Sequence, residues 1–306
     1  MERRRVIVIG SLNYDLFLNV QKLPQLGETY QASSFQTASG GKGANQAVQC
    51  AKLGIDTFMV GAVGKDFMGE YLLESISQYG VHTEYVQQVE GPSGLGVVHL
   101  LKNGGVLSTI VPGANACVGI SDVQRVESLM DEAFAVVLQL EIPIETVQYA
   151  IHAANRHSAK IYLNAAPAHA IEKDCVSLCD TFIANEIEAS YYTKCKISSV
   201  EDALKVIAPF ACDYKVRSVF TLGEQGVVAF DGHKAYHEPA VKTIALDTTG
   251  AGDSFVGGYL KAQITGMSFI DSIRFATQCS AITVSQVGGQ NAMPALDRVK
   301  GFYLPV

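Results

Sequence analysis

Residues 6–10 read Val6-Ile7-Val8-Ile9-Gly10, an unbroken run of β-branched side chains that ends at a glycine. A run without polar alternation predicts a strand buried on both faces, which is typical of a parallel sheet covered by helices. The run is too short for a signal peptide, and Asn13 and Asp15 soon follow it. The chain is therefore expected to open on a central strand.

Helical and strand patterns alternate from about residue 43 onward. Helices are predicted at 44–53, 67–79, 121–130, 144–156, 185–193, 199–211, 251–264 and 268–286. Strands are predicted at 57–63, 134–140, 160–164, 181–183, 217–222 and 227–231, with several more between 84 and 111. Because such alternation implies βαβ units, we expect an α/β fold with a mostly parallel central sheet flanked by helices, in a Rossmann-like arrangement.

Two β-rich segments depart from this alternation. Short strands are predicted at 16–20 and 29–35, with Pro24 and Gly27 in the turn between them, and residues 94–111 contain glycine turns, including Gly104. The sequence has no internal repeat, low-complexity tract or linker. We therefore expect one domain over 1–306, in which segments of about 11–36 and 94–111 form a small β-sheet lid over one edge.

Composition excludes several classes of function. The net charge of -7 argues against a broad basic surface for nucleic acid, and the basic cluster Arg3-Arg4-Arg5 is expected to be a solvated tip. The seven cysteines form no C-x-x-C pair, so reduced thiols in a cytoplasmic protein are expected rather than disulfides or a zinc site. No stretch of about 18 apolar residues occurs, so no membrane association is expected.

The last third of the chain contains Asp247-Thr248-Thr249-Gly250-Ala251-Gly252-Asp253-Ser254-Phe255. We expect a strand to lead into this stretch and an apolar helix to follow it. Gly250, Ala251 and Gly252 would then present bare backbone N–H groups at the helix N-terminus. Orphan N–H groups and the helix dipole both favour negative charge, so the stretch predicts an anion hole for a phosphoryl group.

Asp253 would lie at the mouth of this anion hole. A carboxylate there can accept a proton from a substrate hydroxyl that attacks the γ-phosphate of ATP. The alternative is that Asp253 caps the helix, a common role for aspartate. No G-x-x-x-x-G-K-[ST] motif occurs, and Gly10-Ser11-Leu12-Asn13 after the first strand is not G-x-G-x-x-G, so a P-loop and a dinucleotide fold have little support.

A second constellation, Ser39-Gly40-Gly41-Lys42-Gly43-Ala44-Asn45-Gln46, opens a predicted helix. Lys42 and Asn45 offer the donors and acceptors that a polyol needs. Asn13, Asp15 and Glu141 follow predicted strands, at the carboxyl ends where open α/β sheets bind ligands. Taken singly, each of these residues could serve only a turn or a cap.

A third constellation, Asn185-Glu186-Ile187-Glu188, opens the helix after the strand at 181–183. Asn185 and Glu188 could hold a hydrated Mg²⁺ and nucleotide phosphates. Their three-residue spacing also fits an N-terminal capping box, which the spacing alone favours.

These motifs together make the chain resemble the pfkB-type, ribokinase-like family of carbohydrate kinases. The resemblance extends from Gly10 to about Pro294. Besides the three constellations, it rests on residues 10–15, 138–141, 164–168 and 221–226.

The resemblance implies a role for each matching residue. Catalysis would use the base Asp253 and the anion hole Gly250, Ala251 and Gly252. Sugar binding would use Asn13, Asp15, Gly41, Lys42, Asn45, Glu141 and Asp253. The ATP site would be lined by Asn185, Glu188, Thr221, Gly223, Glu224, Gly226, Gly252 and Thr277. A monovalent cation, usually K⁺, would lie beside Asp247, Thr249, Thr283, Gln286, Gly288 and Ala292, and the lid would form a homodimer.

The function implied is transfer of phosphate from ATP, with Mg²⁺, to the 5-hydroxyl of D-ribose, giving ribose 5-phosphate. Asn13 and Asp15 suit the tight polar end of a free pentose, but a kinase for deoxyribose, another sugar or a nucleoside is the alternative. A non-catalytic sugar-binding regulator on the same fold is a second class. It is disfavoured because Asp253 and the glycines before it are intact.

Overall fold

The computed structural model describes residues 5–102 and 105–299, so Arg3, Arg4 and Gly104 lie outside the described residues. The described chain forms a nine-stranded sheet with the order β13-β12-β11-β10-β9-β8-β1-β4-β5. The seven strands from β5 to β11 pair in parallel, and β12 and β13 add an antiparallel hairpin. The strands are β1 (Arg5–Ile9), β4 (Asp56–Gly64), β5 (His82–Val89), β8 (Ala133–Leu138), β9 (Lys160–Asn164), β10 (Thr181–Asn185), β11 (Arg217–Thr221), β12 (Val227–Phe230) and β13 (Ala235–Glu238).

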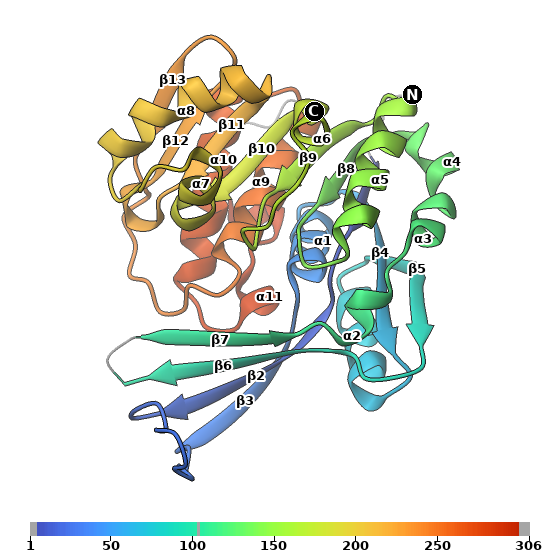
Figure 1. Ribbon diagram of the computed structural model, residues 1–306, viewed down its shortest axis with the longest axis vertical. Coiled ribbons are helices and arrows are strands. Elements are labelled where there is room, and N and C mark those ends of the chain that lie inside the picture. Colours follow the sequence, from blue (N-terminus) through green and yellow to red (C-terminus); the bar gives the residue numbers. More distant parts are fainter. Residues whose placement is uncertain (1–4, 103–104, 300–306) are drawn as a thin grey trace.

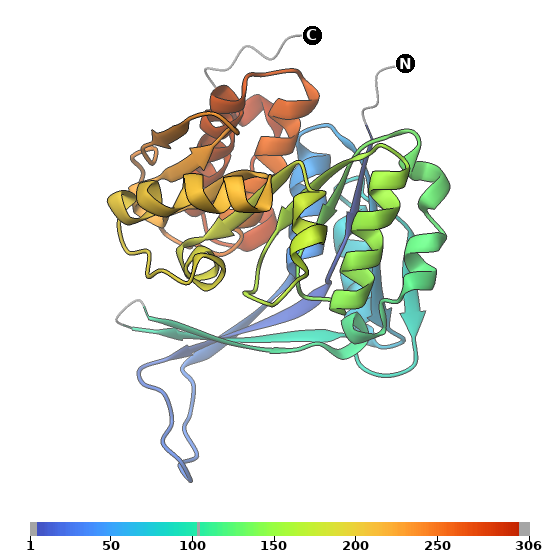
Figure 2. The same ribbon diagram turned by 45° about the horizontal axis from the view of Figure 1, so that its top comes forward.

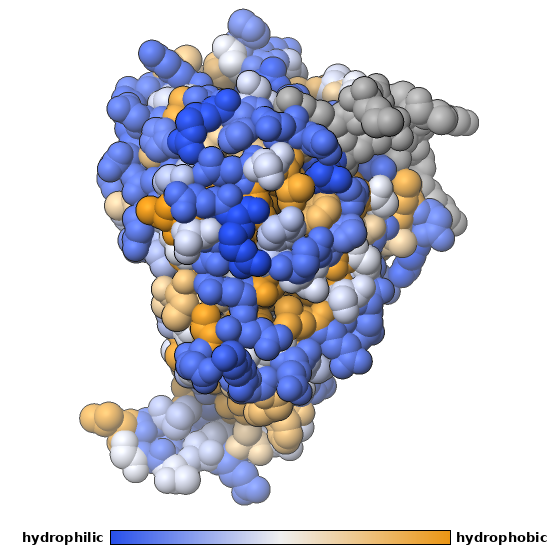
Figure 3. Space-filling view, turned by 90° about the vertical axis from the view of Figure 1, so that its right-hand side faces the viewer, coloured by the Kyte–Doolittle hydropathy of each residue, from blue (hydrophilic) through white to orange (hydrophobic). Residues whose placement is uncertain are grey.

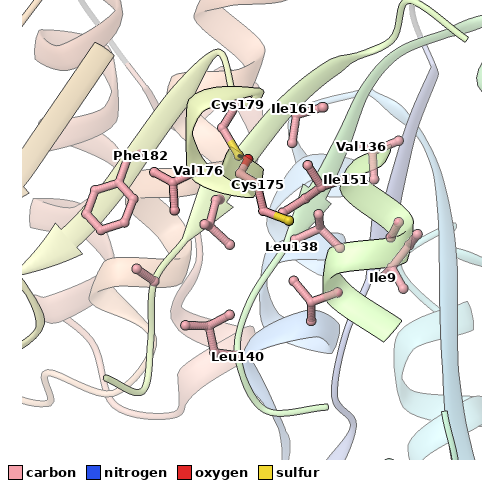
Figure 4. Close-up of a cluster of buried hydrophobic side chains, with 14 of the residues drawn as sticks. Ile9, Val136, Leu138, Leu140, Ile151, Ile161, Cys175, Val176, Cys179 and Phe182 are labelled. Carbon is pink, nitrogen blue, oxygen red and sulfur yellow. Dashed lines mark hydrogen bonds between the residues drawn. The ribbon is translucent and has the colours of Figure 1, made fainter. Parts of the chain in front are cut away.

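Helices cover both faces of this sheet (Figures 1 and 2). Side chains of β1 alternate between two cores: Ile7 and Ile9 pack in one, Val6 and Val8 in the other, and all four are fully buried. The first core also receives α5 (Ile144–Arg156), α6 (Lys173–Ser177), α7 (Glu186–Thr193) and α8 (Val200–Tyr214). Part of it is shown in Figure 4. The second core receives α1 (Lys42–Lys52), α2 (Phe67–Ser77), α9 (Ala251–Ile264) and α10 (Phe269–Val284). The predicted α/β class is confirmed.

A second, four-stranded sheet extends below the main body in Figure 1. Its order is β3-β2-β6-β7, from β2 (Asn13–Val20), β3 (Ser34–Gly40), β6 (Gly94–Leu101) and β7 (Val106–Val111). The expected small β-sheet is therefore present. The strand expected at 29–35 is wrong over residues 29–33. Pairing with β2 begins only at Ser34, because the preceding residues turn at Gly27.

The helix expected at 121–130 is also wrong as one element. It divides into α3 (Ile120–Gln124) and α4 (Glu127–Met130). Val126 leaves helical geometry there with φ −112° and ψ 1°. The remaining short elements are α11 (Gly289–Ala292) and 3-10 helices at Gly113–Cys117, Gly223–Gln225 and Leu296–Arg298.

The surface facing the viewer in Figure 3 is mostly hydrophilic, interrupted by small apolar patches. Within residues 5–102 and 105–299, no helix has the length and apolar content needed to cross a bilayer. All seven cysteines carry free thiols.

Candidate active site

Helix α9 begins at the wall of a large cavity. Its N-cap is Gly250, with φ +75° and no side-chain hydrogen bond. The Ala251 N–H donates to the Thr248 carbonyl at 3.2 Å, whereas no described backbone acceptor takes the N–H of Gly252 or Asp253. A Cβ at Gly252 would meet nothing within 4 Å. The start of α9 thus offers bare N–H groups at the positive end of the helix dipole, which suits an anion.

The segment before α9 does not form the expected strand. Leu246 and Asp247 both donate their backbone N–H to the carbonyl of Val284, the last residue of α10. The segment is therefore attached to a helix end and lines the cavity instead of pairing in the sheet.

Asp253 is buried in the first turn of α9, and its carboxylate does not cap that helix. One oxygen, Oδ2, accepts from Asn45 Nδ2, and the other, Oδ1, accepts from Gln46 Nε2, both at 2.9 Å. The capping alternative is therefore wrong. Both donors lie on α1, so α1 and α9 fix the carboxylate between them.

One cation and four carboxylates set the electrostatics of the site. Burial raises the pKa of Asp253, and Lys42 with the two amides opposes that shift. Burial alone would lower the pKa of Lys42, but the charges of Asp253, Glu141, Glu188 and Asp15 outweigh it and raise that pKa. Lys42 therefore stays an ammonium ion among acidic groups at neutral pH.

The large cavity has a volume of about 860 Å³. It brings together every residue predicted for the ATP site: Asn185, Glu188, Thr221, Gly223, Glu224, Gly226, Gly252 and Thr277. Lys42, Asp253 and the turn Gly250–Gly252 also line it, as do Lys242 and Thr243, which sequence reasoning missed.

The capping box at the start of α7 forms. Asn185 Oδ1 accepts the N–H groups of Ile187 and Glu188, and Glu188 Oε2 accepts the N–H of Asn185 at 2.7 Å. Burial raises the pKa of Glu188, although the hydrogen bond from the Asn185 N–H acts to lower it. Both residues still line the cavity, so capping fixes them in place at its wall.

Asp15 lies in β2 between two glycines of neighbouring strands. A Cβ on Gly40 or Gly96 would come within 1.9 or 2.2 Å of its carboxylate oxygens. No described residue donates a hydrogen bond to this carboxylate. Burial and the charges of Glu141 and Asp253, opposed by Lys42, raise its pKa to about 7. Asp15 lines a smaller cavity of about 300 Å³, where it can accept hydrogen bonds from a ligand.

The other predicted sugar residues lie around Asp15 and Lys42. Asn45 lines the smaller cavity. Asn13 begins β2, and Gly41 has φ +88°, where a Cβ would lie 2.7 Å from the Asn13 nitrogen. Glu141 follows β8 and accepts the backbone N–H of Lys42 at 3.1 Å. Asn13, Gly41 and Glu141 line neither cavity.

The residues predicted for a monovalent cation come from the end of α10, the loops beside it and the end of α11: Asp247, Thr249, Thr283, Gln286, Gly288 and Ala292. The Asp247 carboxylate joins two of these loops, because Oδ1 accepts the Thr249 N–H at 2.9 Å and Oδ2 accepts the Gly288 N–H at 3.1 Å. Gln286 Nε2 donates to the Ala292 carbonyl at 3.3 Å. Asp247, Thr249 and Gly288 also line the smaller cavity.

Sequence reasoning assigned no role to the buried amides that surround Asp253. Gln139 and Asn164 stand at the carboxyl ends of β8 and β9, and Gln290 lies in α11. All three are buried and bond to Asn45 or Gln46. For Gln139 and Asn164 the position at a strand end was the available signal, because polar residues there face the ligand edge of an α/β sheet. Gln290 offered no such signal.

Comparison with known proteins identifies the family. The model of the pfkB family carbohydrate kinases matches residues 3–296. A ribokinase of Schizosaccharomyces pombe is 33% identical over 97% of this chain and 97% of its own. A deoxyribokinase of Salmonella typhi is 30% identical over 96% of both chains. The structure of Arabidopsis thaliana ribokinase complexed with ribose and ATP superposes with a TM-score of 0.86 at 30% identity, covering 96% of each chain.

The family model covers nearly the whole chain, and full-length relatives exceed 30% identity. The fold, with its nine-stranded sheet and its second small sheet, is similar to that of solved ribokinase structures. The chain therefore belongs to the pfkB family of carbohydrate kinases and is an ATP-dependent sugar kinase.

Proposed function

We propose that this kinase transfers the γ-phosphate of ATP to the 5-hydroxyl of D-ribose, with Asp253 as general base. The position of Asp253 carries the proposal. It lines the large cavity with the predicted ATP residues and is hydrogen-bonded to Asn45, which lines the smaller cavity with Asp15. A base at this junction can reach a hydroxyl on one side and a phosphate on the other. We place the reaction in the cytoplasm, which supplies ATP and keeps thiols reduced.

In the proposed reaction, the Asp253 carboxylate accepts the proton of the sugar hydroxyl as that oxygen attacks the γ-phosphorus. A new O–P bond forms, the bond to the β-phosphate oxygen breaks, and ADP leaves. The N–H groups of Gly252 and Asp253 at the start of α9, which no described backbone acceptor takes, would stabilise negative charge on the transferring phosphoryl group. Asp15 and Lys42 would orient the sugar as acceptor and donor.

The nucleotide side also fits a hydrated Mg²⁺. The capping bonds use Asn185 Oδ1 and Glu188 Oε2, while no described residue donates to Glu188 Oε1. That oxygen is available for a water-mediated contact to the ion. When bound, Mg²⁺ would offset the charge of the ATP phosphates.

A coupled ATP-consumption assay with Mg²⁺ and K⁺ tests the substrate. Its panel is ribose, deoxyribose, fructose, tagatose, adenosine and uridine. We expect ribose to give by far the highest kcat/KM. A deoxyribokinase among the relatives makes deoxyribose the closest competitor. A higher kcat/KM for deoxyribose, another sugar or a nucleoside than for ribose would overturn the ribose assignment. Ribose binding without any turnover would favour a regulator.

We expect K⁺ to raise kcat several-fold over Na⁺ at equal ionic strength. Asp247 places one carboxylate between the two loops that the family resemblance assigns to a monovalent cation. A cation beside these loops would order the start of α9. Initial rates in KCl, NaCl and choline chloride check the prediction, and equal rates in all three salts would contradict it.

We also expect a homodimer formed through the small sheet. Its strands expose Phe35, Leu107 and Ile110 at 68%, 48% and 44%. Its outer strands, β3 and β7, each have an unpaired edge in the described structure. Analytical ultracentrifugation should give twice the chain mass for the wild type, and Leu107→Lys with Ile110→Lys should shift it toward the monomer. A monomeric wild type at micromolar concentration would refute the dimer.

A further inference from the structure

Both oxygens of the Asp253 carboxylate are held by neighbouring residues of one helix. Asn45 and Gln46 of α1 each donate one hydrogen bond of 2.9 Å, to Oδ2 and Oδ1 respectively. Two donors at two oxygens fix the rotation of the carboxylate as well as its position. The base can therefore present only its remaining lone pairs to a substrate.

The carboxamide of Gln46 is fully buried and makes three hydrogen bonds. Its Nε2 donates to Asp253 Oδ1 and also to Asn164 Oδ1 at 3.0 Å. Its Oε1 accepts from Gln139 Nε2 at 2.7 Å. Asn164 is itself oriented, because its Nδ2 donates to the Ile183 carbonyl at 3.2 Å.

These partners allow only one orientation of the Gln46 amide. If the amide flipped, its oxygen would face the two acceptor oxygens of Asp253 and Asn164. Its NH₂ group would then face the NH₂ group of Gln139. Three hydrogen bonds would become three repulsive contacts in a buried site. Asn164, which the Ile183 carbonyl orients, and the accepting carboxylate of Asp253 therefore specify that Gln46 offers a donor, never an acceptor, to Asp253. The bond from Gln139 fits this orientation and adds to it.

We propose that Gln46 is a positioning residue for the general base, and that Gln139 and Asn164 act through it. This inference rests on the proposed role of Asp253 and extends it to residues that touch neither substrate. Gln46 would hold Oδ1 so that Asp253 receives the hydroxyl proton in one geometry. Misorientation of a reacting group is costly even when substrate binding is intact.

The hydrogen bond from Gln46 also stabilises the ionised base. It lowers the pKa of Asp253 against burial, alongside Lys42 of α1 and Asn45. Glu141 after β8 acts in the opposite direction, and Asp15 of β2 and Glu188 of α7 also interact electrostatically with Asp253. Losing the Gln46 donor while these charges remain should raise the pH at which Asp253 ionises.

The test is Gln46→Met, which keeps the length of the side chain and removes its hydrogen bonds. We expect kcat to fall about 10- to 100-fold, because a misplacement of about 1 Å at the reacting groups can cost about 100-fold. KM for sugar and for ATP should stay within about threefold, because Gln46 lines neither cavity. The acidic limb of the kcat–pH profile should move to higher pH.

Gln49→Met is the matched control. Gln49 is equally buried on the same helix, but it bonds to Ser254 and to the Pro294 carbonyl instead of Asp253. It should lose thermal stability to a similar degree without the pH shift. The milder Gln139→Met removes only the bond from Gln139 to Gln46 Oε1, and it should add little to Gln46→Met in a double-mutant cycle. If Gln46→Met fails to fold, Gln139→Met takes its place in the kinetic and pH measurements.

An unchanged kcat and pH profile in Gln46→Met, or equal changes in Gln49→Met, would overturn the proposal. A second readout does not depend on turnover. In protein with ¹³C-labelled aspartate, the carboxyl resonance of Asp253 should titrate at higher pH in Gln46→Met than in wild type and Gln49→Met. If no sugar is phosphorylated by wild type, the proposed function fails while this titration still decides whether Gln46 controls Asp253.

Discussion

Asp253→Asn should abolish phosphoryl transfer while ribose affinity stays within a few-fold of wild type. An asparagine keeps the size of the side chain but cannot accept the hydroxyl proton. We expect kcat to fall by at least about 10³-fold, within the range attributed to general base catalysis. The measurement is single-turnover transfer from labelled ATP, with ribose affinity from isothermal titration calorimetry.

The local hydrogen bonds make a stability measurement part of this experiment. Asn45 and Gln46 both donate to Asp253, and asparagine offers only one acceptor oxygen to them. One amide loses its partner, which costs about 1–3 kcal/mol. Removal of a buried carboxylate, whose pKa burial raises, offsets part of this cost. Circular dichroism melting should therefore show a folded variant.

Asp271→Asn provides a closely matched control. Asp253 is the third residue of α9 and Asp271 is the third residue of α10, so both stand near a helix N-terminus. Asp271 is exposed and pairs with Ser268 and Arg274. Its replacement should leave turnover near wild type. Retained turnover in Asp253→Asn would refute the base assignment, and equal loss in both variants would point to general damage.

The sequence predicted the sheet because its strands carry an unambiguous pattern. Val6 to Ile9 have no polar alternation, and the structure buries each of them completely between two helical layers. The capping box of Asn185 and Glu188 was also visible, because it depends on a spacing of three residues within one helix. Both patterns depend only on residues that are close together in the sequence, so the sequence alone can reveal them.

The amide network around Asp253 could not be predicted in the same way. Gln46 and Asp253 are 207 residues apart, and Gln46 and Gln139 are 93 residues apart. No local rule says which buried amide will face which carboxylate. The motif supplied the residues, but only the packing of α1 against α9 and the ends of β8 and β9 brings them into contact.

The prediction of a strand before α9 was wrong for a related reason. A strand was expected there, yet its apolar residues Ile244 and Leu246 are 79% and 63% exposed. The segment borders the large cavity and bonds to the end of α10. Exposed apolar residues and those that fill a core look alike in sequence.

Asp15→Asn should weaken sugar binding and stabilise the free protein at alkaline pH. No described residue donates a hydrogen bond to Asp15, so in the proposed complex its acceptors would be used by sugar hydroxyls. A hydrogen bond to a charged group contributes about 1.5–3 kcal/mol, so we expect KM for ribose to rise about 100-fold. KM for ATP should change little, because Asp15 does not line the large cavity. Steady-state kinetics with each substrate varied separately test this split.

The stability change follows from the raised pKa of Asp15. Its pKa is about 7 in the folded protein and 3.8 in an unperturbed aspartate, so the folded state binds more protons between these values. Stability is then lost as the pH rises from about 4 to about 7, by at most about 4 kcal/mol for three pKa units. Asparagine cannot ionise and removes this loss. The Tm of the variant relative to wild type should therefore be several degrees higher at pH 8 than at pH 4.

Asp66→Asn tests the same argument with the opposite sign. Asp66 caps α2, and its hydrogen bonds from Ser93 and Gly69 outweigh burial and lower its pKa. Its replacement should reduce Tm at pH 8 and leave KM for ribose near wild type. A rise in Tm for Asp15→Asn together with a fall for Asp66→Asn would mean that Asp15 is held at a cost to stability, which binding of a polyol would recover. If Asp15→Asn instead lowers Tm at pH 8 and keeps its affinity for ribose, Asp15 supports the fold and the sugar must be held by other residues.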